Sequence, residues 1–563
     1  MNKFFRYIQC GAATLLLAGG LSACVNDLDV TPIDPALNGD IQPEQLFAKC
    51  YSRLATSGNN GGDDNVDVDG LDGGFQHTFR QMWNSNELTT DEAICGWGDE
   101  GIPSYCYNSY DASHPMLRGY YYGLAISVTF CNQYIEEFGD YDPVMTAEIR
   151  FLRAFNFYLL TDAFGNIPFT TKISGDNPEQ ASRAEVYSFI ESELKAIIGE
   201  NSDDNSNILN DPQPKKYGQS GYGRVDKAAA WLLLARLYLN AEVYTGTAQW
   251  ANARDYAKKV IDSAYQLHKN GYSGTGVDGI DREFTAYQML FMGDNSTTDA
   301  AYEAILPIIQ DGTRTTSWGG TNFLIASTVD ADVHPYLYDD TEVNGLYQNN
   351  TWGGNRARPQ LVRLFFPESD YSEDDLPQVH AYDATSIAGD DRALFETLDR
   401  SFNVEDVSNF KYGFAVAKFN NFKCDGSKGS DQTYADSHLL YMRKAEAYLT
   451  YAEALTRLAG SGAAPADAVN AINEIRGRAH AEQKASYSLN DILDEWGREF
   501  FFEGRRRVDL IRFGKFGGNS GYNWQWKGGA YNGRSFDAYR NVFAIPTDDL
   551  IANSNLQQNE GYK

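Results

Sequence analysis

Hydrophobic residues recur at intervals of three and four along much of the chain, which is the spacing of a helix that buries one stripe of its surface. This pattern predicts helices at 42–55, 146–164, 182–198, 223–244, 251–267, 437–458 and 465–481. A short turn separates 223–244 from 251–267, and the small residues Ala228, Ala229 and Ala235 would let the two helices approach closely. Such pairs are typical of tetratricopeptide-like hairpins. We therefore predict a mainly α-helical scaffold of helical hairpins.

The middle of the chain has a different pattern. From 271 to 434 long periodic stretches are few, and Gly, Asp, Asn, Tyr and Trp are frequent. A loop-rich segment of roughly 160 residues is too long to be a passive connection, and long loops on a rigid scaffold usually carry function. The predicted organisation is an N-terminal part of the helical scaffold at 41–270, a large irregular subdomain at 271–434 and a C-terminal helical part at 435–563.

The N-terminus has the pattern of a cleaved export signal. Lys3 and Arg6 precede a small and apolar run that is too short for a permanent membrane span. The residues from Leu21 to Cys24 read LSAC and resemble a bacterial lipobox, so we expect lipidation at Cys24. Residues 1–23 are then a lipoprotein signal peptide and 24–40 an acidic tether. Attached lipid chains would hold the protein at a membrane surface.

Composition narrows the classes of function. The chain has 77 acidic and 47 basic residues and a net charge of −30, which argues against a nucleic-acid partner. It has no HExxH, GxSxG or P-loop motif, and GTGVDG at 274–279 lacks the strand and helix of a dinucleotide site. We predict a non-enzyme without a cofactor. A surface endo-glycosidase stays an alternative, since two suitably spaced carboxylates would suffice.

Several motifs follow one another along nearly the whole chain: LSACVNDLD, NELTTDEA, GRVDKAAAWLLLARLYLNAEVY, EFFFEGRRRVDLIRFGKF and FAIPTDDLIANSNLQQNEGY. In this order they resemble the SusD/RagB family, the surface glycan-binding lipoproteins of Bacteroidetes polysaccharide-utilisation systems. The resemblance implies about four tetratricopeptide-like hairpins, glycan contacts mostly in the irregular subdomain, and no catalysis.

The resemblance also implies partners and a location. The protein would bind oligosaccharide or polysaccharide and deliver it to a SusC-like TonB-dependent transporter, which it covers as a lid. It would be lipid-anchored in the outer membrane and face outside. Relatives of the RagB type act in peptide uptake, so peptide cargo is a further alternative.

Tryptophans in glycine-rich loops are the candidate sugar contacts, because a sugar offers C–H faces for stacking and a rim of hydroxyls for hydrogen bonds. The loop after ELTTDE often supplies a stacking aromatic in the family, and Trp97 lies there. Packing of these tryptophans within their loops is the alternative interpretation. The predicted glycan-binding residues are Trp97, Trp318, Trp352 and Trp83, with Asp67, Asp99, Asn322, Arg356 and Arg358 as polar partners.

Two further segments allow alternatives. Asn65 to Gln76 matches the first positions of an EF-hand loop, but Gln76 replaces the final glutamate, so we prefer an exposed acidic turn to a calcium site and predict no metal. In 499–516, glutamates and aspartates alternate with arginines next to three phenylalanines. We predict a structural cluster with Glu503 paired to Arg506 or Arg507, and Asp509 paired to Arg505 or Arg512, a partner-docking role being the alternative.

The cysteines add little to this picture. Cys50, Cys95, Cys106, Cys131 and Cys424 follow the lipidation site and include no CxxC pair. We expect core residues, with one disulfide allowed by their number.

Overall fold

The computed structural model describes residues 41–59, 65–201, 206–330 and 351–562. Contacts divide the chain into two units, 1–46 and 47–563. The predicted signal peptide, Cys24 and the tether lie outside the described residues.

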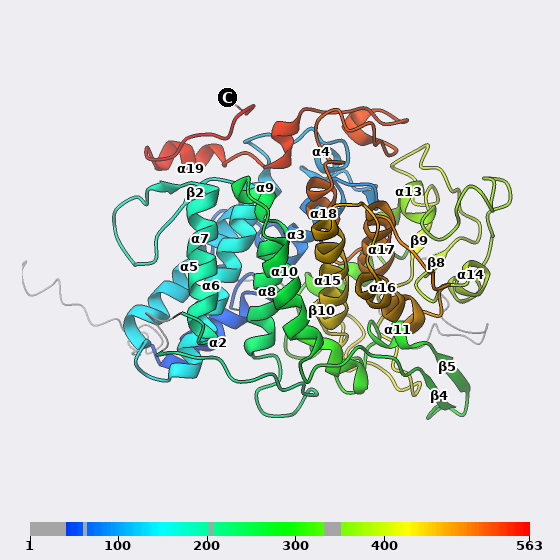
Figure 1. The fold of residues 1–563 in the computed structure, drawn as a ribbon, viewed down its shortest axis with the longest axis horizontal. Coiled ribbons are helices and arrows are strands. Elements are labelled where there is room, and N and C mark those ends of the chain that lie inside the picture. Colours follow the sequence, from blue (N-terminus) through cyan, green and yellow to red (C-terminus); the bar gives the residue numbers. More distant parts are fainter. Residues whose placement is uncertain (1–40, 60–64, 202–205, 331–350, 563) are drawn as a thin grey trace, which may run out of the picture. The chain divides into compact units, whose positions relative to one another are not determined.

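Helices dominate the described chain at 43–261 and at 444–552, as Figure 1 shows. The N-terminal set contains α2 (Pro43–Ser52), α3 (Thr78–Glu87), α4 (Ile102–Cys106), α5 (Pro115–Phe138), α6 (Pro143–Phe164), α7 (Arg183–Ile197), α8 (Lys227–Leu239), α9 (Ala241–Thr245) and α10 (Trp250–Ile261). The C-terminal set contains α15 (Lys444–Ala459), α16 (Ala466–Arg478), α17 (Leu489–Phe500), α18 (Arg506–Arg512) and α19 (Thr547–Ala552). The predicted mainly α-helical class is confirmed.

Side-chain caps fix where several of these helices begin. Asp142 Oδ1 accepts hydrogen bonds from the amides of Val144 (2.8 Å) and Met145 (2.9 Å), and Pro143 occupies the first turn of α6. Ser182 and Glu185 form a reciprocal capping box on α7. These contacts satisfy amides that have no partner inside the helix.

The middle of the chain is made of short elements. Its helices are α11 (Ala286–Met289), α12 (Gly320–Ser327), α13 (Pro359–Val362) and α14 (Ala381–Ala388). Short 3-10 helices lie at Gly74–Gln76, Asp299–Glu303, Lys527–Gly529 and Ala538–Asn541. The strands of the described chain form five antiparallel pairs. These are β1 (Ala93–Cys95) with β7 (Asn355–Ala357), β2 (Ile167–Pro168) with β3 (Gln180–Ala181), β4 (Tyr272–Thr275) with β5 (Asp281–Phe284), β6 (Ala304–Ile308) with β10 (Leu439–Arg443), and β8 (Phe395–Glu396) with β9 (Ala415–Val416).

One predicted helix is partly wrong. The segment 437–458 was expected to be helical throughout, but Leu439–Arg443 is strand β10 and the helix begins at Lys444. Leu439, Leu440 and Met442 are all buried, and a short apolar run of this kind suits a buried strand as well as a helix.

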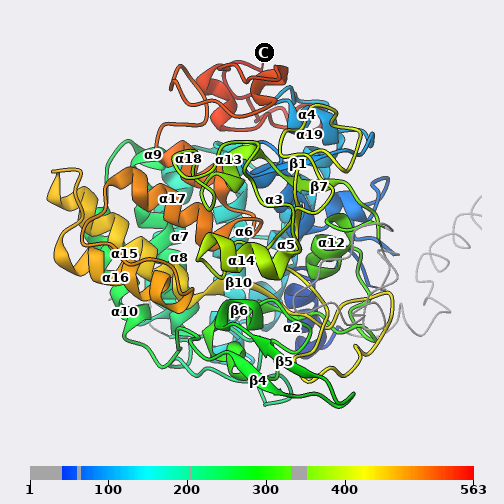
Figure 2. The same ribbon diagram turned by 90° about the vertical axis from the view of Figure 1, so that its right-hand side faces the viewer.

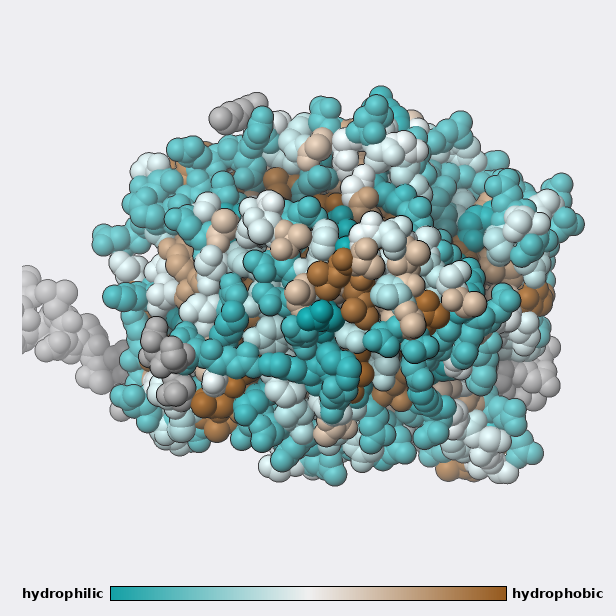
Figure 3. All heavy atoms as spheres, viewed as in Figure 1, coloured by the Kyte–Doolittle hydropathy of each residue, from teal (hydrophilic) through white to brown (hydrophobic). Residues whose placement is uncertain are grey.

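The scaffold brings together helices that are distant in the sequence. Helix α5 packs on α6, α6 on α7, and α8 on α10. Helix α10 then packs on α15, and α15 on α16, so the N-terminal and C-terminal sets of helices share one helical layer (Figures 1 and 2). The face drawn in Figure 3 is mostly hydrophilic, in keeping with the acidic composition. In the described part of the chain, no helix combines the length and the apolar character needed to cross a bilayer.

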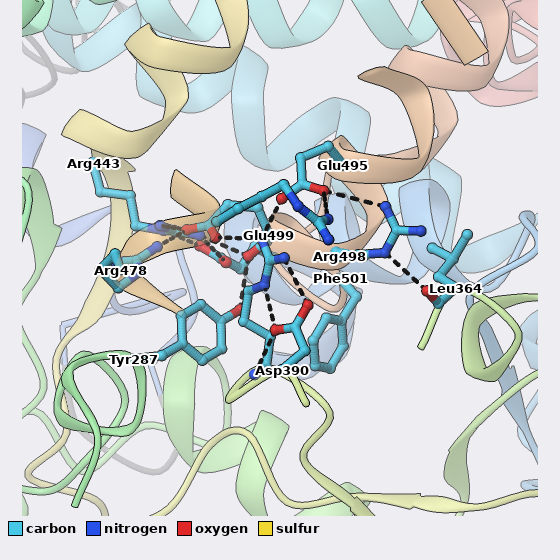
Figure 4. A network of polar contacts seen from close by, with 12 residues as sticks. Tyr287, Leu364, Asp390, Arg443, Arg478, Glu495, Arg498, Glu499 and Phe501 are labelled. Carbon is cyan, nitrogen blue, oxygen red and sulfur yellow. Dashed lines mark hydrogen bonds and ion pairs between the residues drawn. The ribbon is translucent and has the colours of Figure 1, made fainter. Parts of the chain in front are cut away.

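A buried ion-pair network joins these layers (Figure 4). Glu499 on α17 contacts Arg443 at 2.5 Å and Arg392 at 3.2 Å, and it also pairs with Arg478. Glu499 and all three arginines have side chains with no exposed surface. Burial alone would raise the pKa of Glu499, but the three guanidinium groups outweigh it and hold the pKa at about 2.

The cluster at 499–516 is largely internal. Asp509 pairs with Arg505 at 2.9 Å and with Arg512 at 2.7 Å, as predicted. The predicted pairing of Glu503 is wrong, because Glu503 contacts Lys418 and Arg443, each at 2.7 Å. Helix α17 ends at Phe500 and α18 begins at Arg506, and Phe502 and Gly504 between them have φ of 63° and 78°. Helical spacing therefore does not hold across this turn.

All five cysteines after the lipidation site are buried and free. The core interpretation is confirmed, and the disulfide that their number allowed is absent from this structure.

Candidate functional site

Four half-buried aromatic side chains form a continuous row, which we call the aromatic arc: Trp97, Trp352, Trp318 and Tyr434. Ring centroids are 6.3 Å apart from Trp97 to Trp352, 5.8 Å from Trp352 to Trp318, and 4.9 Å from Trp318 to Tyr434. Successive ring planes are inclined by 60°, 48° and 49°. Neighbouring rings are therefore tilted relative to each other, and each member keeps part of its surface exposed.

The pairing of β1 with β7 brings the first two rings together. Cys95 lies opposite Asn355, and the Gly96 amide donates to the Gly354 carbonyl at 3.1 Å. Trp97 follows β1 by two residues and Trp352 precedes β7 by three, so antiparallel pairing places them side by side. A Cβ atom on Gly354 would lie 2.3 Å from the Trp97 indole, and Gly354 has φ of 134°. Only glycine allows this approach.

The other two rings come from loops beside β6 and β10. Trp318 precedes α12, and the end of that helix holds Trp352 through a 2.8 Å hydrogen bond from the Trp352 amide to the Ala326 carbonyl. Tyr434 precedes β10, and the Gly312 amide donates to Asp436 at 3.1 Å across the two loops. The β6 and β10 pair therefore sets the distance between Trp318 and Tyr434.

Both arginines predicted to contact sugar are buried, and the structure contradicts that role. Arg356 donates to the carbonyls of Tyr412, Gly354 and Val407 at 2.7 to 2.8 Å. Arg358 donates to the carbonyls of Ala93 at 2.8 Å, Cys106 at 3.0 Å, Leu88 at 3.2 Å and Gln525. Burial lowers the pKa of Arg358 to about 10. Both side chains instead fix the loops that carry Trp97 and Trp352, since arginine can donate to several carbonyls at once.

Three more predicted contacts are enclosed by protein. Trp83 is fully buried between Phe323 and Phe502, and its indole donates to the Phe502 carbonyl at 2.9 Å. Asn322 on α12 is also fully buried. Asp67 has a 6% exposed side chain that pairs with Lys49 at 2.6 Å and Arg53 at 3.0 Å. All three residues lie in polar or glycine-rich segments of the sequence. In the folded chain, packing buries Trp83 and Asn322, and ion pairs engage Asp67.

Asp99 is exposed two residues after Trp97, so it stays a predicted partner for sugar hydroxyls. Within the segment 65–76, the Gln76 side-chain amide exchanges hydrogen bonds of 3.0 and 3.1 Å with the backbone of Val68. The Asp67 carboxylate already pairs with the side chains of Lys49 and Arg53. The described residues contain no group of three or more His, Cys, Asp or Glu side chains placed to hold a metal ion.

Tyr434 is the member of the arc that sequence reasoning missed. It lies in GSDQTYADS, a polar loop with one aromatic residue, and this is the same local signal that singled out the tryptophans. Extending that criterion from tryptophan to tyrosine would have found it.

Residues 401–562 match the model of the SusD family. The chain is 36% identical over 598 aligned residues to the starch-binding protein SusD of Bacteroides thetaiotaomicron, and the alignment covers 100% of both chains.

Two solved structures share the fold. Surface glycan-binding protein A from Bacteroides uniformis matches with a TM-score of 0.63 and 20% identity, over 92% of this chain and 99% of that chain. Surface glycan-binding protein A from Bacteroides thetaiotaomicron, in complex with laminarihexaose, matches with a TM-score of 0.62 and 18% identity, over 92% and 98%. The full-length identity to SusD confirms the predicted resemblance: this chain belongs to the SusD family.

Proposed function

We propose that this protein binds glycan chains without cleaving them, and that the aromatic arc is the surface on which the sugars stack. The observation that carries the proposal is the row of four half-buried rings, each within 6.3 Å of the next. Exposed ring faces suit the C–H patches of sugars, and each stacking contact adds about 0.5–1.5 kcal/mol beyond area burial. Several weak contacts along one chain would give micromolar to millimolar affinity.

The tilt between neighbouring rings of the arc favours a curved neutral glucan over a flat one. A straight, ribbon-like chain cannot lie flat on rings whose planes turn by 48° to 60° at each step, whereas a helical chain can follow them. The name of the relative at 36% identity, a starch-binding protein, points to the same class. We therefore propose a starch-like α-glucan as the ligand.

The cellular setting in this proposal rests on family membership and the N-terminal motif. Lipidation at Cys24 would anchor the protein in the outer membrane, facing outside, and a SusC-like TonB-dependent transporter would receive the glycan. The transporter partnership is tested by solubilising native membranes and isolating the proteins that co-purify with a tagged chain. A TonB-dependent transporter in the eluate supports it, and a Cys24→Ala chain should lose membrane association.

Replacing Trp318 by alanine is expected to weaken maltoheptaose binding about 10- to 100-fold, because the central part of the arc loses one stacking platform. Calorimetry on the chain from Val25 onward, which retains the whole unit 47–563, measures the change. Trp231→Ala is the matched control, since Trp231 is also half-buried but lies on α8 against Lys259.

Cellohexaose is the matched straight ligand for the same titrations. Equal affinity of the wild-type chain for both sugars would refute the curvature argument. Undiminished maltoheptaose binding by the Trp318→Ala chain would refute the arc as the site.

A further inference from the structure

A cavity lies outside the aromatic arc. It has a volume of about 400 Å³ and opens between the end of α2 with its following loop and the end of β6 with its following loop. We call it the α2–β6 pocket. Its size falls in the range of small-molecule sites. The described residues that line it and carry the argument are Tyr51, Leu54, Ala55, Ile308, Arg314 and Thr315.

Most polar groups in the walls are already engaged by the protein. The Tyr51 hydroxyl donates to Glu148 at 2.6 Å. The Thr56 hydroxyl donates to the carbonyl of Ser52 at 3.1 Å, and the Thr315 hydroxyl accepts from the Asp311 amide at 3.1 Å. Aliphatic side chains of Leu54, Pro307, Ile308 and Ile309 make up much of the remaining lining. A sugar, which needs hydrogen-bond partners around its rim, would find few here.

Arg314 is the exception among these groups. It is the one charged residue among the described lining residues, and its side chain is exposed. Within the described part of the chain its guanidinium forms no ion pair, hydrogen bond or ring contact. Asp311 interacts with it electrostatically, but that carboxylate already accepts hydrogen bonds from Tyr217 at 2.9 Å and from Thr313. An unpaired cation stands at an apolar cavity in a chain of net charge −30.

We propose that the α2–β6 pocket binds a small organic acid, with its apolar body against the aliphatic walls and its single negative charge paired to Arg314. A guanidinium recognises a carboxylate through paired N–H donors, and burial of the apolar body supplies the remaining affinity. A single charge suits the pocket better than a polyanion, which the acidic surface would repel.

The pocket and the arc are neighbours with separate linings. The His77 ring lies between them: its Nε2 atom is 2.9 Å from the Ala55 carbonyl on the pocket side. On the other side the ring contacts Gly319, where an added Cβ atom would lie 2.2 Å from Nε2. Gly319 follows Trp318 directly, yet none of the four arc residues lines the pocket. The two sites can therefore be tested independently.

The test is calorimetric titration of the chain from Val25 onward with decanoate, and with decan-1-ol as the uncharged match. A second titration uses 3-phenylpropionate, which shows whether the pocket prefers a straight-chain or an aromatic acid. We expect saturable one-to-one binding of at least one acid, and at least fivefold weaker binding of the alcohol. If neither acid gave saturable binding up to 10 mM, the proposal would be overturned.

Three variants locate the binding. Arg314→Gln should weaken acid binding about tenfold and leave the alcohol unchanged, while Arg314→Lys should restore part of the loss. Ala55→Phe should abolish binding of both probes by filling the cavity, because Ala55 contributes a methyl group and no hydrogen bond from its side chain. Unchanged acid affinity in both Arg314→Gln and Ala55→Phe would place the acid elsewhere and refute the assignment. Maltoheptaose affinity in the same variants shows that the chain is folded and reports on the arc separately.

Discussion

Replacing Arg443 by methionine is expected to lower the free energy of unfolding by about 3–5 kcal/mol, the usual cost of removing one partner of a buried ion pair. Arg443 contacts Glu303 at 3.1 Å, Glu499 at 2.5 Å and Glu503 at 2.7 Å. The side chains of Arg443, Glu303 and Glu499 have no exposed surface. Its loss would leave three carboxylates with fewer cations in a region that water does not reach. The change is measured as the shift of the urea unfolding midpoint.

Arg254→Met is the control for this substitution. Arg254 pairs with Asp255 at 2.6 Å, but both side chains are exposed, and such pairs contribute about 0–1 kcal/mol. If Arg443→Met were as stable as Arg254→Met, the network in Figure 4 would not be a major source of stability.

Stability should fall steeply when the pH is lowered from about 4.5 towards 2. Surrounding arginines overcome the effect of burial and hold the pKa of Glu495, Glu499 and Asp509 at about 2 in the folded chain. Because these pKa values are depressed, their contribution is complete above the unfolded value near 4.5 and is lost as the pH falls through the folded value. For one such carboxyl the loss is about 3 kcal/mol.

Glu92 has the opposite effect on the pH dependence of stability, and it acts over a higher pH range. Burial raises its pKa to about 7 despite the pull of Arg506. Its contribution is therefore complete below about 4.5 and declines as the pH rises to 7. The depressed carboxyls and Glu92 together predict that stability is greatest near pH 4.5.

Thermal unfolding of the wild-type and Glu499→Gln chains from pH 2 to pH 8 tests the acid limb. Glutamine resembles the protonated carboxyl, so the stability difference should be largest above pH 4.5 and shrink towards pH 2. A difference that does not change with pH would contradict the assignment of Glu499. Asp255→Asn, at the exposed pair, should give nearly parallel curves.

The helical scaffold was accessible from sequence because its long amphipathic segments have a period that short-range physics fixes. The starts of α6 and α7 follow from Asp142 and from the Ser182 and Glu185 box, which are visible in the sequence. The glycine-flanked tryptophans 97, 318 and 352 were also visible, and the structure places them in one row.

The polar partners could not be assigned in the same way. Arg356 lies within a three-residue strand and Arg358 directly follows it; the partner strand is more than 250 positions away, and no local pattern fixes that register. The sequence does not say that several backbone carbonyls there need donors, so two buried arginines look like surface cations. Asp67 was likewise misassigned because Lys49 and Arg53 reach it only in the folded chain.

The arc draws its four rings from positions 97, 318, 352 and 434, and this spread has a consequence for biogenesis. Contacts between such distant positions form late, because each requires closure of a long stretch of chain. A C-terminally truncated polypeptide that lacks Tyr434 and β10 would have an incomplete arc. Retention on an immobilised glycan would therefore select completely folded molecules from a heterogeneous preparation.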